Sequence, residues 1–89
     1  MKTYLITYDL LPDNHELAVT SIIKTMGQWA HPLEKVWLVK TYYSRQEVFD
    51  RLRIADGTMA TKLLIIQVTD DWISLNLPPE VVKWMQGGL

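Results

Sequence analysis

A single carboxylate, Asp9, ends the apolar run Tyr4-Leu5-Ile6-Thr7-Tyr8 near the start of the chain. A carboxylate at the end of a strand can form a turn, cap a helix or ligate a metal ion. One carboxylate does not hold Mg²⁺ firmly, because hard cations take several oxygen ligands. A two-fold symmetric dimer would supply a second Asp9. The pattern alone favours a turn-forming or capping role.

The two histidines, His15 and His31, are the next candidates for chemistry. The chain has no cysteine and no His-x-x-x-His spacing, so no zinc site is predicted. His15 falls in the first turn of a predicted helix, where solvent exposure is expected. His31 can be considered as a general base, although a surface or interface role is favoured at a sheet edge.

Aromatic and basic residues raise the question of nucleic-acid binding. Four tryptophans and a tyrosine pair can stack on bases, but core or interface packing is the favoured interpretation: Trp29, Trp37, Trp72, Trp84, Tyr42 and Tyr43. The only arginines, Arg45, Arg51 and Arg53, alternate with acidic residues, which favours a solvated face over a phosphate patch. The net charge of −1 excludes nucleic-acid binding that is driven by an overall positive charge.

The elements that must position these residues follow a simple order. Strand patterns cover residues 3–9, 29–33, 36–41 and 62–69, the last of which is nearly all apolar and is predicted to be well buried. A helix over 14–26 has Asp13 as its predicted N-cap, and Gly27 ends it. A capping box formed by Ser44 and Glu47 begins a second helix, which ends at Asp56-Gly57, and a short third helix begins at Pro79. Pro32 must lie at a sheet edge, because proline cannot donate to a ladder.

This order predicts an α+β, ferredoxin-like βαββαβ fold in one domain over residues 1–89. The four-stranded antiparallel sheet is expected in the order 4-1-3-2, with two helices on one face and a short C-terminal helix. The opposite face, which carries Leu5 and Thr7, lacks a helical layer in this prediction, so a homodimer is expected. No apolar run approaches the length of a membrane span. A cytoplasmic protein without a membrane partner is therefore predicted.

Several short stretches carry a resemblance to a known family: "TYDL" at a strand end, "WAHPLEKVWLVKT" and "KLLIIQV". The chain resembles the CRISPR-associated endonuclease and spacer-integration family (the second of its core proteins), and more closely its compact SinR-like relatives. VapD-type toxin ribonucleases share the same fold. The resemblance implies a ferredoxin-like homodimer of antiviral defence that acts on nucleic acid, with Asp9 at the family's metal-binding position and Mg²⁺ or Mn²⁺ as the cofactor.

Two departures from the family pattern shape the functional hypotheses. "LLPDNHELAV" stands where typical members carry Arg- or Lys-rich sequence, and "LPPEVVKWMQGGL" replaces the C-terminal strand that subunits exchange. A metal-dependent endonuclease centred on Asp9 would then hold its substrate through other groups, with His31, Lys40, Arg45 and Arg51 as further candidates. The alternatives are a non-catalytic dimeric interaction module and a VapD-like toxin that cleaves RNA.

Overall fold

Four strands and three helices form the protein in the computed structural model, which describes residues 1–9, 16–56 and 62–89. In chain order they are β1 (Lys2–Asp9), α1 (Glu16–Thr25), β2 (Gln28–Leu33), β3 (Val36–Thr41), α2 (Arg45–Asp56), β4 (Lys62–Val68) and α3 (Pro79–Gln86). This confirms the predicted order of elements. The predicted N-cap Asp13, the helix start at Asn14 and His15 lie outside the described residues.

The strands form one antiparallel sheet in the order β2-β3-β1-β4. This is the predicted order 4-1-3-2 read from the other edge. Strand β1 is central, so that Tyr4 pairs with Val39 on one side and with Gln67 on the other. The strand that contains Pro32 lies at the edge, as predicted, and its pairing with β3 shifts register between Ala30 and Leu33.

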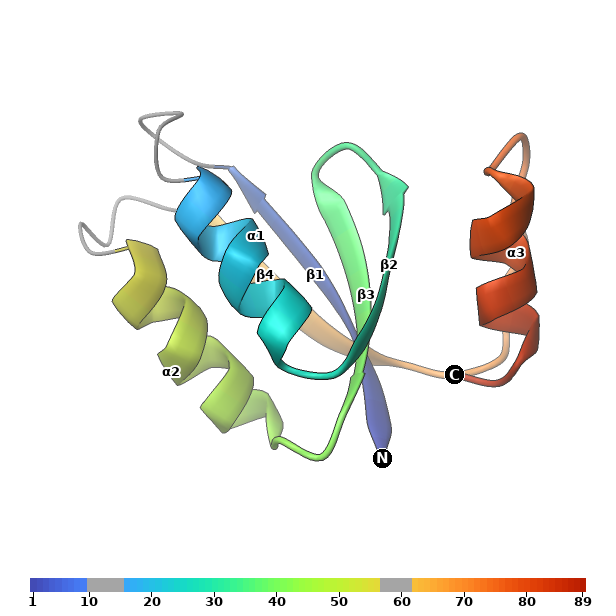
Figure 1. Ribbon diagram of the computed structural model, residues 1–89. Coiled ribbons are helices and arrows are strands. Elements are labelled where there is room, and N and C mark those ends of the chain that lie inside the picture. Colours follow the sequence, from blue (N-terminus) through green and yellow to red (C-terminus); the bar gives the residue numbers. More distant parts are fainter. Residues whose placement is uncertain (10–15, 57–61) are drawn as a thin grey trace.

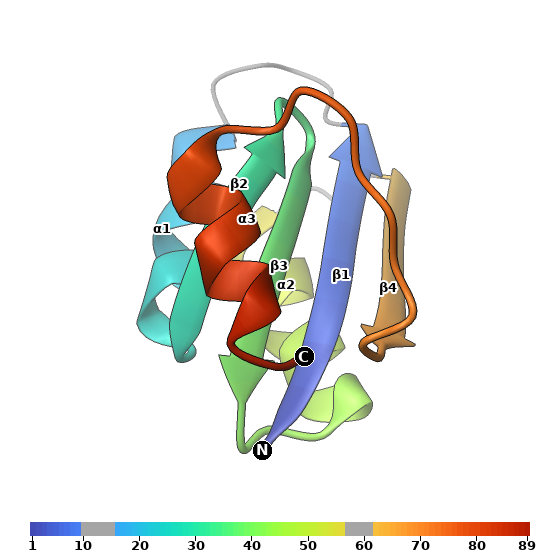
Figure 2. The same cartoon turned by 90° about the vertical axis from the view of Figure 1, so that its right-hand side faces the viewer.

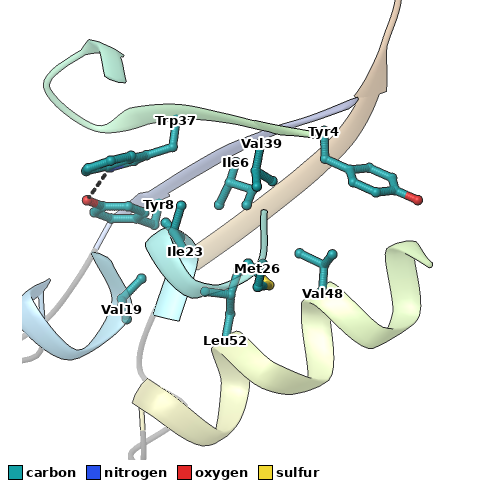
Figure 3. Close-up of a cluster of buried hydrophobic side chains, with 10 residues drawn as sticks. All are labelled: Tyr4, Ile6, Tyr8, Val19, Ile23, Met26, Trp37, Val39, Val48 and Leu52. Carbon is teal, nitrogen blue, oxygen red and sulfur yellow. Dashed lines mark hydrogen bonds between the residues drawn. The ribbon is translucent and has the colours of Figure 1, made fainter. Parts of the chain in front are cut away.

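Helices α1 and α2 cover one face of the sheet, and α3 lies on the opposite side (Figure 1). Figure 3 shows the core between the sheet and the two helices. Alternate residues of β1 point into it, and Tyr4, Ile6 and Tyr8 are at most 5% exposed. The other buried side chains of this cluster come from α1, α2, β3 and the turn after α1: Val19, Ile23, Met26, Trp37, Val39, Val48 and Leu52.

The opposite face is partly covered by the chain's own C-terminal segment (Figure 2). Val81 and Met85 of α3 form a second buried cluster with Ala30 and Leu38. Residues 69–78 run back along β1 and β4 before α3 begins (Figure 2). The expectation of a face without a helical layer is therefore wrong for its β2–β3 half, because α3 packs there.

Strand β4 is an edge strand, and the prediction that it is well buried is wrong. Its side chains alternate: Leu63 and Ile65 pack against the core under the helices, whereas Leu64 and Ile66 are 52% and 46% exposed on the other face. A nearly continuous apolar run is typical of a strand that is covered on both faces. Here one of its faces is left at the surface.

Local sequence explains two of the boundaries. At the start of α2 the Ser44 hydroxyl accepts a hydrogen bond from Glu47 N (3.1 Å), and the Glu47 carboxylate accepts one from Ser44 N (3.0 Å). This is the predicted capping box. Gly27 lies between α1 and β2, where a Cβ would overlap the carbonyl oxygen of Lys40. The absence of a side chain thus allows the turn to approach β3 closely.

None of the helices in the described part of the chain has the length and apolar character needed to cross a membrane.

Candidate functional site

Asp9 is the last residue of β1 and is exposed at the surface. Because side chains alternate along a strand, Asp9 shares a face with Thr7 and Leu5, the face that α1 and α2 leave uncovered. Its cross-strand neighbour in β4 is Lys62. The carboxylate therefore stands beside a cation at the rim of the sheet, within reach of a ligand from solvent.

Within one chain, Asp9 offers a metal ion a single carboxylate. No group of three His, Cys, Asp or Glu side chains that could hold a metal occurs among the residues that the structure describes. Mg²⁺ and Mn²⁺ prefer several oxygen ligands. Firm binding at Asp9 would thus require ligands from a second subunit, a substrate or water.

Lys40 and Arg51 lie away from Asp9. Lys40 pairs with Thr3, six residues before Asp9 on the same strand, which corresponds to roughly 20 Å along β1. Its ammonium lies 4.5 Å from the ring centroid of Trp84. The Arg51 guanidinium lies 4.1 Å from the ring centroid of Tyr43, which follows the end of β3 that pairs with the start of β1. Neither cation can serve the Asp9 carboxylate of its own chain.

Arg45, the first residue of α2, faces a different part of the surface. Its side chain lines a pocket of about 360 Å³ between α2 and β4, together with Gln46, Phe49 and three residues of β4. The pocket walls are the helix and the outer strand. The structure thus does not gather the candidate cations Lys40, Arg45 and Arg51 into one phosphate site.

His31 has a structural environment on the helix-covered face. Its ring stacks on Trp37, with ring centroids 3.8 Å apart and planes 7° from parallel. Its Nε2 lies 2.9 Å from the carbonyl oxygen of Glu34. Because a carbonyl only accepts, Nε2 carries the proton in this hydrogen bond. His31 therefore fastens the turn between β2 and β3, and it lies on the face opposite Asp9.

Tyr8, the residue before Asp9, is held in a protonated state. Burial raises the pKa of its phenol, a hydrogen bond from Trp37 partly opposes this, Glu16 raises it further and Lys35 lowers it. The ion pair between Lys35 and Glu16 lies close by and raises the pKa of Lys35. At neutral pH the Tyr8 phenol is therefore neutral and is not a nucleophile.

A second group of residues, which sequence reasoning did not assemble, surrounds the exposed edge of β2. Trp29 and His31 of β2 line a groove of about 430 Å³ together with Glu80 and Trp84 of α3. Pro78, Ala30 and Val81 complete its walls. The two tryptophans are far apart in the sequence, and nothing in their local patterns indicates that α3 returns to this edge. We call this feature the β2-edge groove.

Comparison with known proteins gives a fold but no family. No family model matches the sequence, and no curated protein matches it. Among solved structures, the chain is similar to a hypothetical protein, TT1823 from Thermus thermophilus, with a TM-score of 0.59 and 18% identity. The similarity covers 86% of this chain and 94% of that one. At this identity the likeness shows the shared fold alone.

Proposed function

We propose that the chain is a ferredoxin-like, nucleic-acid-associated domain that works in the cytoplasm as a homodimer and cleaves phosphodiesters with Mg²⁺ or Mn²⁺ held between two Asp9 carboxylates. One observation carries this proposal. Asp9 lies on the same sheet face as the exposed Leu64 and Ile66, because the register pairs Thr7 with Leu64 and Leu5 with Ile66. A dimer formed through this apolar strip would bring two copies of Asp9 toward its axis.

The apolar strip extends beyond β4. Besides Leu64 and Ile66, it includes two residues of the segment after β4, Ile73 and Leu75, which are 96% and 84% exposed. Each square ångström of apolar surface removed from water contributes about 25 cal/mol. A two-fold axis across the strip would pair it with itself, as in most homodimers. The small core of an 89-residue chain gains stability from such burial.

The chemistry follows from the approach of two like charges. Two carboxylates at close range repel each other, and a divalent cation between them relieves that repulsion. The bound cation would polarise a phosphoryl oxygen or lower the pKa of a coordinated water. Lys62, the cross-strand neighbour of Asp9, is better placed than Lys40 or Arg51 to contact a substrate phosphate.

The central experiment compares the wild type with Asp9→Asn on single-stranded RNA and on double-stranded DNA. Each substrate is incubated with Mg²⁺, with Mn²⁺ and with a chelator. Asp71→Asn is the matched control, because Asp71 is also an exposed carboxylate but follows β4 at its far end. We expect cleavage to need the metal and Asp9 but not Asp71. Cleavage that survives both the chelator and Asp9→Asn would belong to a contaminant and would overturn the nuclease proposal.

The dimer is tested separately by sedimentation. At micromolar concentration the wild type should sediment at twice the chain mass of 10.4 kDa. Ile66→Lys should return the protein to the monomer mass, because it places a charge in the apolar strip. A wild type that sediments as a monomer would remove the second carboxylate and with it the proposed metal site.

The alternative function is a non-catalytic dimeric interaction module. The scattering of Lys40, Arg45 and Arg51 over three surfaces favours it, since a nuclease needs cations beside its scissile phosphate. A wild-type dimer that cleaves neither substrate would support this alternative. Cleavage confined to RNA would instead support a VapD-like toxin ribonuclease.

A further inference from the structure

The β2-edge groove combines flat aromatic surfaces with flanking cations. Trp29 is 41% exposed although it is a large aromatic residue. Its ring lies 5.4 Å from that of Trp37, at an angle of 55°, so Trp37 does not cover it face to face. On the other side of the groove, Trp84 projects from α3, which lies beside β2 in Figure 2. The exposed part of the Trp29 ring can therefore stack on a planar group from solvent.

A lysine ammonium lies over the ring of each of the two groove tryptophans. The ammonium of Lys24, in the last turn of α1, lies 5.0 Å from the Trp29 ring centroid and 5.6 Å from that of Trp37. The ammonium of Lys40 lies 4.5 Å from the Trp84 ring centroid. The exposed Trp29 and the partly buried Trp84 therefore each have a positive charge within a few ångströms. Glu80 supplies one carboxylate in the groove wall.

We propose that the β2-edge groove binds single-stranded nucleic acid, with a base stacked on Trp29 and the neighbouring phosphates beside Lys24 and Lys40. Stacking on an aromatic side chain combined with nearby positive charge is the usual basis of single-strand binding. A base in a duplex has no free face, so double-stranded nucleic acid does not fit this mode. The groove volume of about 430 Å³ accommodates a nucleotide rather than a helix.

Glu80 would determine how a bound nucleotide is oriented in the groove. Its carboxylate only accepts hydrogen bonds, so it repels a phosphate but can accept from the N–H groups on the Watson–Crick edge of a base. The base edge would thus point toward Glu80, and the backbone would lie toward the two lysines. Glu80→Gln should change the preference among bases, because an amide can both donate and accept.

The inference deepens the proposed association with nucleic acid but does not depend on cleavage at Asp9. The groove lies along β2. Trp29 of β2 pairs with Val39 of β3, and Val39 in turn pairs with Tyr4 of β1. Asp9 is five residues further along β1 and is next to the opposite edge strand, β4. Binding can therefore be measured in the presence of a chelator, which removes the metal ion that the proposed cleavage needs.

The test is the fluorescence anisotropy of labelled 12-nucleotide single-stranded RNA and DNA, titrated with the protein in a chelator at low salt. We expect Trp29→Ala to weaken binding about 5- to 150-fold, which is the range for the loss of one stacked base. Tyr42→Ala is the matched control, because Tyr42 is 87% exposed but lies outside the groove. Its affinity should equal that of the wild type. Equal affinities of Trp29→Ala and Tyr42→Ala would overturn the proposal.

A charge series keeps the test decisive if Trp29→Ala does not fold. Lys24→Gln should weaken binding and reduce the slope of log affinity against log salt by about 0.7, the contribution of one phosphate contact on a single strand. Lys83→Gln, at an exposed lysine of α3, should leave the slope unchanged. A Lys24→Gln slope equal to that of the wild type would contradict the proposed phosphate contact.

Three further outcomes separate this proposal from the others. Asp71→Asn should bind the single strands as tightly as the wild type does, because Asp71 is exposed and does not line the groove. A wild type that fails to bind either single strand at micromolar concentration would overturn the groove proposal, even if it cleaves duplex DNA. A change of sedimentation mass in Trp29→Ala would also overturn it, because the groove would then be a subunit interface.

Discussion

The indole Nε1–H of Trp37 donates a hydrogen bond of 3.2 Å to the phenol oxygen of Tyr8 inside the core (Figure 3). Both side chains are at most 5% exposed, and they join β3 to β1 under the two helices. Buried polar groups need such partners, because an unpaired one keeps its full desolvation cost. This bond therefore fixes the end of β1 immediately before Asp9.

Tyr8→Phe should destabilise the protein by about 1–3 kcal/mol, because the Trp37 N–H would be left buried without its acceptor. Urea unfolding followed by circular dichroism measures this loss. The slope of the unfolding free energy against urea should stay the same if the fold is kept. Tyr42→Phe is the control, since the Tyr42 side chain is 87% exposed. Equal stabilities of the two variants would contradict the role given to the bond.

The same phenol predicts a loss of stability in alkali. Burial raises the pKa of Tyr8 above 10.0, so the folded state holds this proton more tightly than the unfolded state. Its stabilising contribution is therefore fully present below pH 10 and is lost as the pH rises through the raised pKa. The pKa of Lys35 is also raised, which acts in the same direction. The stability of the wild type should fall more steeply above pH 10 than that of Tyr8→Phe, and parallel pH profiles would refute the prediction.

Gly27→Ala should be strongly destabilising, by at least about 2 kcal/mol, because the new Cβ meets the backbone carbonyl of Lys40 rather than a side chain that can move. Gly87→Ala is the matched control. Gly87 has φ −69°, which any residue adopts, and a Cβ there would lie 3.3 Å from the Trp84 carbonyl oxygen. Thermal unfolding of the two variants compares them directly. Similar melting temperatures would show that the β2–β3 unit can shift to make room.

The capping box of α2 gives a smaller and more local prediction. Ser44→Ala should cost about 0.5–2 kcal/mol, since the Glu47 N–H loses its acceptor at the exposed start of the helix. Ser44→Asp should restore most of this loss, because aspartate caps as well as serine does. Ser21→Ala, at an exposed position within α1, serves as the control for replacing a serine. A Ser44→Asp variant as unstable as Ser44→Ala would contradict capping as the cause.

The features that the sequence predicted correctly are the local ones. Alternation along residues 3–9 and 36–41, the capping box at Ser44 and the edge position of Pro32 each depend on a few neighbouring residues. Together they determined the order of the elements and of the strands. Asp9 was likewise placed at a strand end by the pattern of β1 alone.

The features that it did not predict depend on how distant elements meet. The pattern of residues 79–86 indicates a helix, but not that Val81 and Met85 pack on Ala30 and Leu38. For the same reason the pairing of Trp29 and Trp84 across the β2-edge groove was not expected. Likewise, an apolar run such as β4 does not reveal which of its faces the rest of the chain covers. The distance between Lys40 and Asp9 was not predicted either, because it is determined by the register in which β1 pairs with β3.

Substitutions at two neighbouring isoleucines of β4 distinguish the contribution of the core to stability from that of the proposed dimer. Ile65 pairs with Ile6 and packs against the core, whereas Ile66 pairs with Leu5 and is 46% exposed in the single chain. Ile65→Ala should therefore cost about 2–4 kcal/mol at every protein concentration. Ile66→Ala should cost below about 1 kcal/mol where the protein is a monomer, because half of its side chain is already in water.

The cost of Ile66→Ala should increase with protein concentration if the proposed dimer buries this residue, since association stabilises the folded state by mass action. Thermal unfolding over a hundred-fold range of concentration measures both variants side by side. The melting temperature of the wild type should rise with concentration, that of Ile65→Ala should rise in parallel, and that of Ile66→Ala should rise less. Concentration-independent melting of all three proteins would mean that the apolar strip of β4 does not pair two chains, and the proposed second carboxylate at Asp9 would have no source.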